Sequence, residues 1–136
     1  MKKDIILAGV GGQGILTIAT IIGHAAAAAG VNLKQAEVHG MSQRGGDVQS
    51  NLRLSTEPIH SDLIKKGAAD IIISMEPMEA LRYLPYLGKE GWVITSSNPF
   101  VNIPNYPELD SLNEELSRLP KASVLPIEDM AKDNGV

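Results

Sequence analysis

The sequence contains no cysteine in its 136 residues. This absence excludes disulfide bonds, an iron–sulfur cluster held by thiolates of this chain, and a cysteine-ligated zinc site. Aromatic residues are also few, with one Phe, one Trp and three Tyr, which argues against a surface on which nucleic-acid bases stack. The net charge of −4 argues against nucleic acid or an anionic membrane as a partner, because both favour a basic face.

Long hydrophobic runs are missing as well. No segment approaches the roughly 20 apolar residues that cross a bilayer. Lys2 and Lys3 precede an apolar run, as in a signal peptide, but Asp4 and the Gly-rich segment at 11–14 interrupt that pattern. We therefore expect a cytoplasmic protein without membrane contact, and the length suits one domain with one core.

A strand, a Gly-rich turn and a helix begin the chain. Residues 5–8 are an apolar run typical of a strand buried on both faces of a parallel sheet. Gly9, Gly11 and Gly14 then give the spacing G-x-G-x-x-G, and a helical pattern of apolar residues starts at Ile15. In this context glycines allow a tight turn, close approach of a ligand to the backbone, and close packing of helix on strand.

We call residues 10–14 the Gly turn. Its candidate functional residues are Gly11, Gly12, Gln13 and Gly14, because the N–H groups of the first helical turn could bind an anion there. The alternative is that the glycines serve turn geometry alone, which any connection from strand to helix can require. A Cβ atom at Gly12 is expected to clash where the helix meets the strand.

A second Gly-rich segment, residues 37–46, lies between predicted strands at 33–38 and 48–55. We call it the second motif. It combines glycines with basic, acidic and imidazole side chains, so it is a candidate site for a cofactor or for a subunit interface. Its candidate residues are Glu37, His39, Gly40, Met41, Ser42, Gln43, Arg44, Gly45 and Gly46.

The side chains of the second motif suggest several roles. Arg44 could bind a phosphate or a carboxylate through two parallel hydrogen bonds. Gly45 and Gly46 would admit a ligand or the backbone of a partner, while Glu37 and His39 could orient a substrate group. The alternatives are a subunit interface alone, an interface that also contacts the active site or coenzyme A, and a structural arginine paired with an acid. Arg44→Ala is expected to abolish activity or assembly without unfolding the chain.

The rest of the chain continues the alternation of strands and helices. Residues 48–55 alternate apolar and polar side chains, which indicates an antiparallel or edge strand. The elements expected after it are a short helix at 62–66, strands at 69–74, 91–96 and 122–126, a helix opened by Met75-Glu76-Pro77, and helices at 110–119 and from 129. The sequence therefore predicts an α/β fold of three layers, with a Rossmann-like, mostly parallel sheet and helices on both faces.

A dinucleotide site is one function that this pattern suggests. It requires an acidic residue near the end of the second strand, roughly 20 residues beyond the glycines, to bind a ribose hydroxyl. Glu37 lies 23 residues after Gly14. The Gln-Arg-Gly-Gly loop has no place in that pattern, so an independent NAD- or FAD-binding domain is the alternative hypothesis and not the first.

The two motifs together, Gly11-Gly12-Gln13-Gly14-Ile15 and Glu37-Val-His-Gly-Met-Ser-Gln-Arg-Gly-Gly46, resemble the gamma-type domain of the 2-oxoacid:ferredoxin oxidoreductases. Within this superfamily the second motif is most similar to that of the beta subunit of the indolepyruvate enzymes. The resemblance extends from the first strand to Ile127. Members of the family are usually longer, so the resemblance implies that residues 1–136 are a single gamma-type domain without its natural C-terminal part.

The resemblance also implies a division of labour. Complexes of this family decarboxylate a 2-oxoacid on thiamine diphosphate with Mg²⁺, pass electrons through 4Fe-4S clusters to ferredoxin, and transfer the acyl group to coenzyme A. This chain has no cysteine for a cluster, and no Asn-Asn pair follows Gly46-Asp47 at the spacing of a thiamine diphosphate–magnesium motif. We therefore expect these cofactors on a larger alpha subunit and the chain alone to be inert. A non-catalytic scaffold module is the remaining alternative.

Overall fold

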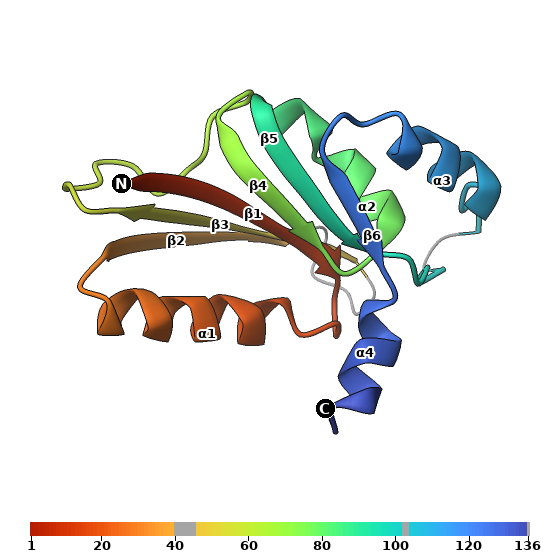
Figure 1. Ribbon diagram of the computed structural model, residues 1–136, viewed down its shortest axis with the longest axis horizontal. Helices are drawn as coiled ribbons and strands as arrows, with labels where there is room; N and C mark the ends of the chain where they lie inside the picture. The colour runs from red at the N-terminus through yellow and green to blue at the C-terminus, as the bar shows by residue number, and fades with distance from the viewer. Residues whose placement is uncertain (40–45, 102–103, 136) are drawn as a thin grey trace.

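The computed structural model describes residues 1–39, 46–101 and 104–135, and these form a six-stranded sheet with helices (Figure 1). The strands are β1 (Lys2–Val10), β2 (Asn32–His39), β3 (Asp47–Ser55), β4 (Ala69–Ser74), β5 (Leu87–Ser96) and β6 (Ala122–Leu125). The helices are α1 (Ile15–Ala28), α2 (Pro77–Arg82), the 3₁₀ turn η1 (Leu84–Tyr86), α3 (Leu109–Ser117) and α4 (Ile127–Asp133).

The strand order in the sheet is β2-β3-β1-β4-β5-β6. Strands β1, β4, β5 and β6 are parallel to one another, whereas β3 runs antiparallel to both of its neighbours, β1 and β2. The alternation at 48–55 therefore predicted the antiparallel strand, but β3 lies inside the sheet and not at its edge. Polar side chains of β3 are accordingly buried, and Asn51 accepts a hydrogen bond of 3.3 Å from the N–H of Ile64.

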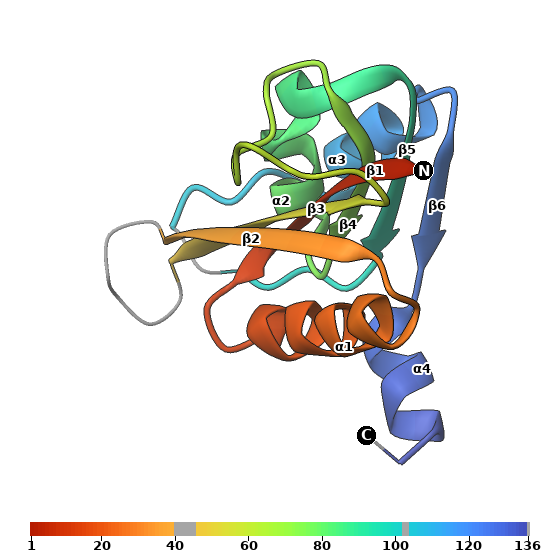
Figure 2. The same cartoon turned by 90° about the vertical axis from the view of Figure 1, so that its left-hand side faces the viewer.

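Two apolar cores lie on opposite faces of the sheet. On one face, Leu7 and Leu52 are buried together with Ile15 and Ala19 of α1. The other face has its own buried cluster, which includes apolar side chains of β1, β4 and β5 together with α2 and α3. Figures 1 and 2 show α1 on one side of the sheet and α2 and α3 on the other. The expected three-layer fold with helices on both faces is confirmed.

Residues 62–66 form bends and a turn and not the short helix that the sequence analysis expects. Five residues form few helical hydrogen bonds, too few to offset the cost of helix nucleation. Ser61 instead accepts a 3.3 Å hydrogen bond from the N–H of Leu63, and the side chain of Ile64 turns into the core, where it is 4% exposed. No helix in the described part of the chain combines the length and apolar character needed to cross a membrane.

The topology brings three connections to one edge of the sheet. The end of β1 and the start of β3 are register partners, since Val10 pairs with Asp47 in the antiparallel ladder. The end of β4 lies on the other side of β1, where Ala8 pairs with Ser74 in the parallel ladder. The Gly turn, the end of the second motif and the connection from β4 to α2 therefore meet at this edge, which is where ligands bind in open α/β sheets.

Candidate functional site

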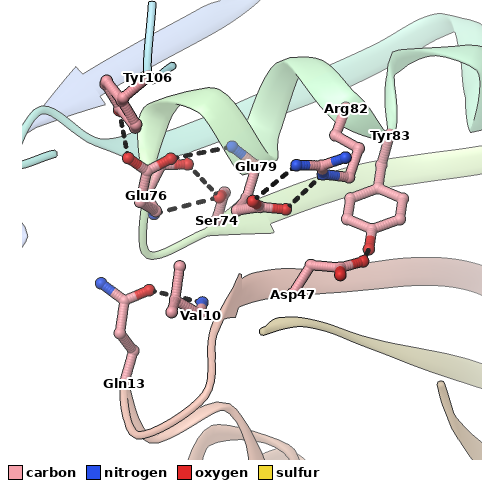
Figure 3. Close-up of polar contacts among 9 residues, drawn as sticks. All are labelled: Val10, Gln13, Asp47, Ser74, Glu76, Glu79, Arg82, Tyr83 and Tyr106. Atoms are coloured by element: carbon pink, nitrogen blue, oxygen red, sulfur yellow. Dashed lines mark hydrogen bonds and ion pairs between the residues drawn. The ribbon is translucent and has the colours of Figure 1, made fainter. Parts of the chain in front are cut away.

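Gln13 ties the Gly turn to the neighbouring connection. Its Oε1 accepts a 2.8 Å hydrogen bond from the N–H of Val10 (Figure 3). Its Nε2 donates to the carbonyl of Met75 at 3.2 Å. The N–H of Gln13 also donates to the carbonyl of Val10 at 3.0 Å. The side chain of Gln13 thus accepts a hydrogen bond within the Gly turn and donates one to the start of the β4–α2 connection, so it joins the two segments.

Glycines in the Gly turn and just before it serve two different purposes. Gly12 and Gly14 have φ angles of 95° and 85°, a left-handed conformation that side chains rarely adopt. A Cβ atom at Gly12 would meet nothing within 4 Å, so the clash expected there is wrong. The close contact is at Gly9, where a Cβ atom would lie 2.8 Å from Cδ1 of Ile15. Gly9 is therefore the residue that lets the helix approach the strand.

A cavity of about 360 Å³ opens beside the Gly turn and the start of α1. It is lined by Val10, Gly11, Gly12, Gly14, Ile15, Leu16, Thr17 and Val48. No side chain caps the N-terminus of α1, where Gly14 is the N-cap residue. The cavity therefore combines apolar walls with backbone N–H groups at a helix N-terminus, an arrangement that can receive an apolar group carrying a polar or anionic end.

The second motif reaches this edge through Gly46. The carbonyl of Gly46 accepts a 2.8 Å hydrogen bond from the N–H of Gly11, so the end of the second motif contacts the Gly turn directly. Gly40, Met41, Ser42, Gln43, Arg44 and Gly45 lie outside the described residues. Of the candidate residues in the two motifs, those of the Gly turn and Gly46 are brought together in the described structure.

Glu37 and His39 lie on β2, which is the outermost strand on one side of the sheet. Glu37 is exposed and accepts a 2.9 Å hydrogen bond from Nε2 of Gln35. Strand β3 separates β2 from β1, and neighbouring strands lie roughly 5 Å apart. Strand β2, which carries Glu37, is therefore about 10 Å from β1, twice the distance of a direct neighbour. The dinucleotide pattern, which needs that acid on the strand beside β1, is not reproduced.

Glu76 is a fully buried carboxylate at the start of α2 (Figure 3). Its Oε1 caps the helix by accepting a 3.0 Å hydrogen bond from the N–H of Glu79. Its Oε2 accepts from the N–H of Phe100 at 3.1 Å and from the hydroxyl of Tyr106. The segment Met75-Glu76-Pro77 is predicted from the sequence to open a helix, and in the structure the Glu76 carboxylate also holds the loop that follows β5.

Glu79 is the second fully buried carboxylate, one turn further along α2. It accepts hydrogen bonds from Nε of Arg82 at 2.8 Å and from Nη2 of Arg82 at 3.3 Å. Beside this pair, the hydroxyl of Tyr83 donates to Asp47, the first residue of β3, at 3.1 Å. We call these four residues and Glu76 the acidic cluster, because they connect α2 with the end of the second motif.

The ionisation of the acidic cluster reflects its burial. Burial raises the pKa of Glu79 above its ordinary value, although the hydrogen bonds and charge of Arg82 act in the opposite direction. Burial, followed by the charge of Asp47, raises the pKa of Tyr83. Burial and the hydrogen bond to Glu76 do the same to the pKa of Tyr106. Both phenols are therefore protonated donors at neutral pH.

The acidic cluster is built to hold segments together. The carboxylates of Glu76 and Glu79 are occupied by donors of the same chain. Within the residues that the structure describes, no group of three or more His, Asp or Glu side chains is arranged to hold a metal ion. The arrangement can therefore hold the start of α2, the start of β3 and the loop after β5 together.

The sequence pattern did not predict Asp47, Glu79, Arg82 and Tyr83 of the acidic cluster, nor Tyr106, which donates to Glu76. A signal existed for Glu79, since an acidic residue three positions after a helix-capping residue belongs to the capping-box pattern. Nothing in the sequence pairs Tyr83 with Asp47, or Tyr106 with Glu76, because 36 and 30 residues separate the partners. Only the folded chain brings these pairs together.

Comparison with solved structures defines the class of fold. The 2-oxoglutarate:ferredoxin oxidoreductase from Magnetococcus marinus, solved with 2-oxoglutarate, coenzyme A and succinyl-CoA bound, superposes with a TM-score of 0.70 at 17% sequence identity. The match covers 97% of this chain and 21% of the Magnetococcus chain. The fold is thus one that also occurs as about a fifth of a much longer oxidoreductase polypeptide.

The chain belongs to the pyruvate ferredoxin/flavodoxin oxidoreductase family, whose model matches residues 4–136. The indolepyruvate oxidoreductase subunit IorB of Thermococcus kodakarensis is 44% identical over 121 residues, which are 84% of this chain and 59% of that protein. The subunit of the same name from Archaeoglobus fulgidus is 41% identical over 133 residues, 93% of this chain and 65% of that protein. The chain thus spans about six tenths of the length of these relatives, and the predicted membership of this family is confirmed.

Proposed function

We propose that this chain is the smaller subunit, or part of it, of a cytoplasmic indolepyruvate:ferredoxin oxidoreductase. The complex would oxidatively decarboxylate aryl pyruvates to acyl-CoA, with coenzyme A as co-substrate and ferredoxin as electron acceptor. The observation that carries the proposal is the identity of more than 40% to indolepyruvate oxidoreductase subunits over most of the chain. The meeting of the Gly turn and Gly46 at one edge supports it, because both motifs that carry the resemblance converge there.

The redox cofactors of such a complex do not fit this chain. The sequence has no cysteine to ligate a 4Fe-4S cluster. Within the described residues, no group of three or more His, Asp or Glu side chains is arranged to hold a metal ion. We therefore assign the thiamine diphosphate, its Mg²⁺ and the clusters to a larger alpha subunit, and we assign to this chain a surface that meets that subunit.

The two motifs would contribute to this surface in different ways. The Gly turn presents backbone and a cavity of about 360 Å³, and it is held in place by Gln13 and Gly46. Among the residues outside the described structure, Arg44 remains the predicted contact to a carboxylate or phosphate. This chain would thus complete the binding site of the complex without performing the electron transfer itself.

The proposal is tested by expressing the chain with and without the larger subunit encoded in the same organism. The expected result is a brown complex with broad iron–sulfur absorption that reduces a dye when indolepyruvate and coenzyme A are supplied. Pyruvate and 2-oxoglutarate serve as comparison substrates. A colourless chain that never associates with the larger subunit, or full activity of the larger subunit without this chain, would overturn the proposal.

A further inference from the structure

We propose that the end of the sheet opposite the Gly turn holds a separate binding site, for a small molecule that carries a phosphate group. The site lies between the first residues of β1, the last residues of β3 and residues 58–66, which belong to the connection from β3 to β4. Figure 1 shows the N-terminus of β1 and this connection at the end of the sheet away from the start of α1. The inference does not rest on the proposed function and adds a ligand that this chain binds by itself.

Two adjoining cavities form this phosphate site, with volumes of about 300 and 500 Å³. Both cavities are lined by Lys2, Asp4, Arg53, Ser61 and Lys65. The smaller cavity also borders Ile59, and the larger one borders Lys66. Each cavity is large enough for a small organic ligand, and positively charged side chains surround it.

Arg53 is held in one orientation within the phosphate site. Its Nε donates a 3.0 Å hydrogen bond to Oδ1 of Asp4, and its Nη1 donates a 2.9 Å hydrogen bond to the carbonyl of Ser61. Asp4 is 1% exposed, and its own N–H donates to Oδ2 of Asp70 at 2.8 Å. No hydrogen bond among the described residues uses Nη2 of Arg53. An oriented guanidinium with N–H donors to spare is suited to bind a phosphate, because it loses little conformational freedom on binding.

A single carboxylate balances the first two cations of the site. Asp4 is the one acid among the described residues that line the cavities. It forms the ion pair with Arg53, and Nζ of Lys2 lies 3.1 Å from its Oδ2. The charge of Asp4 is therefore already shared by two cations, and none of it remains for the other lysines of the site.

Lys65 and Lys66 supply positive charge that the chain leaves unbalanced. Both side chains are exposed, and neither forms an ion pair with any residue that the structure describes. The neighbouring acid, Asp62, lines neither cavity. The site thus gathers four of the chain's 12 Lys and Arg residues, although the net charge is −4. A phosphate ester, with a charge of about −1.5 to −2, would match the two remaining ammonium groups.

The shape of the site favours a small molecule over an acidic protein surface. The side chain of Arg53 is only 20% exposed, so its donors lie within the cavities and not on the outer surface. A phosphate group can enter a cavity of this size, whereas a flat protein surface would reach mainly the exposed lysines. Leu54 and Ile59 are half-buried walls of the smaller cavity, and they can receive the organic part of the ligand.

Titration of the purified full-length protein with inorganic phosphate and pyrophosphate, at constant ionic strength, tests the site. Both anions should bind, pyrophosphate more tightly, and acetate with its single charge should bind more weakly than either. Lys65→Gln should raise the Kd for pyrophosphate about fivefold or more, because it removes one charged donor. Lys132→Gln is the matched control, because Lys132 is an exposed lysine of α4, away from the site (Figure 1). The control should bind as tightly as wild type.

Arg53→Lys tests the oriented guanidinium, because it keeps the charge and removes the fork of donors. This variant should also bind pyrophosphate more weakly. Circular dichroism and thermal melting establish whether it is folded, since Arg53 is a partner of the buried Asp4. If Arg53→Lys does not fold, Lys65→Gln still decides the question, because Lys65 is exposed and has no ion pair in the described structure.

Backbone amide chemical shifts of isotope-labelled protein locate the bound anion. Pyrophosphate should shift the amides of residues 53–66 and leave those of residues 11–15 in place. Shifts confined to residues 11–15 would put the anion at the N-terminus of α1 and would overturn the inference.

Two further results would also overturn it. One is the lack of binding of either anion to wild type at millimolar concentration, and the other is an equal Kd for wild type and Lys65→Gln. If neither anion binds, but Lys65→Gln weakens association with the larger subunit, the lysines meet an acidic protein surface and the phosphate site is wrong. The anion titrations contain no larger subunit, so their result is independent of the proposed function.

Discussion

A carboxylate without exposed surface must find its hydrogen-bond donors within the protein, because an unpaired buried charge is very costly. Glu76 has a backbone donor on each side, from Glu79 and from Phe100, and a phenol donor from Tyr106. A single side chain thereby fixes the start of α2 and the loop after β5. At the scale of the residue, Glu76 thus joins two segments that are distant in the sequence.

Replacing Glu76 by Gln should therefore destabilise the chain. The amide of Gln keeps one acceptor oxygen, but its NH₂ group would face the donors that now bond to the second carboxylate oxygen of Glu76. Each hydrogen bond to a charged group contributes about 1.5–3 kcal/mol. We expect a loss of about 2–4 kcal/mol in the free energy of unfolding, measured by urea denaturation. Tyr106→Phe removes one donor only and should cost about 1–2 kcal/mol. Equal stability of Glu76→Gln and wild type would contradict this account of the carboxylate.

Glu79 should make stability depend on pH. Burial raises its pKa in the folded chain above the ordinary value of 4.5, so the folded state binds the proton more tightly than the unfolded state. The resulting stabilisation is complete below pH 4.5 and is lost as the pH rises through the raised pKa. Relative to Glu79→Gln, which cannot titrate, the wild-type free energy of unfolding should decrease as the pH rises.

Urea denaturation between pH 4 and pH 8 measures this difference. Glu114→Gln, which removes an exposed carboxylate of α3, serves as the control for the loss of a charge. A difference between wild type and Glu79→Gln that increases with pH would mean that the ion pair with Arg82 outweighs burial, and would refute the prediction.

At the scale of the element, the contact of α1 with β1 depends on the absence of a side chain at Gly9. A Cβ atom there would lie 2.8 Å from Cδ1 of Ile15 and 3.0 Å from Oε1 of Gln13. The helix would have to move away from the strand, or Ile15 would have to leave its rotamer. The glycine thus leaves room for the side chains of Ile15 and Gln13 where the first helix packs on the sheet.

Gly9→Ala should cost about 1–3 kcal/mol of stability through overpacking. Ile15→Val removes Cδ1, the atom in the closest contact, and by itself should cost about 0.5–1.5 kcal/mol. The two changes should compensate, so that the double variant is more stable than the sum of the single effects predicts. Thermal melting of the four proteins measures the coupling, and strict additivity would show that Ile15 is not the obstructing group.

At the scale of the whole molecule, the strand order decides between the two functions that the Gly turn suggests. A dinucleotide site needs an acid on the strand next to β1, at the carboxyl edge. In this sheet β3 occupies that position and runs antiparallel, while Glu37 lies on β2 one strand further away. The same Gly-rich turn therefore opens onto Gly46 and Asp47 and not onto a ribose-binding carboxylate.

The isolated chain should accordingly bind neither NAD nor FAD. A ligand at 100 times its Kd stabilises a protein by roughly 2.7 kcal/mol, so millimolar nucleotide should leave the Tm unchanged, whereas the larger subunit should raise it. Thermal melting with each addition measures both effects. A rise in Tm with NAD or FAD that disappears in Glu37→Gln would instead favour the independent nucleotide-binding domain.

Apart from residues 62–66, the sequence by itself determined which segments become strands and helices, and it predicted helices on both faces of the sheet. The physical reason is that hydrophobic periodicity and glycine spacing are local properties. The apolar run at 5–8, the glycines after it and the alternation at 48–55 each report a backbone conformation within a few residues. The Gly turn and the second motif carried the family resemblance. The segment Met75-Glu76-Pro77 indicated the start of a helix.

Only the tertiary structure decided which of these segments are neighbours. It placed β3 between β2 and β1, and it put the close contact between helix and strand at Gly9, where the sequence had suggested Gly12. It also brought Asp47 to Tyr83 and Glu76 to Tyr106. Contacts between residues this far apart depend on the packing of the whole chain, and no local pattern records them. Burial has the same origin: a glutamate is polar in every sequence, and Glu76 and Glu79 become buried, hydrogen-bonded groups only once α2 packs against the sheet.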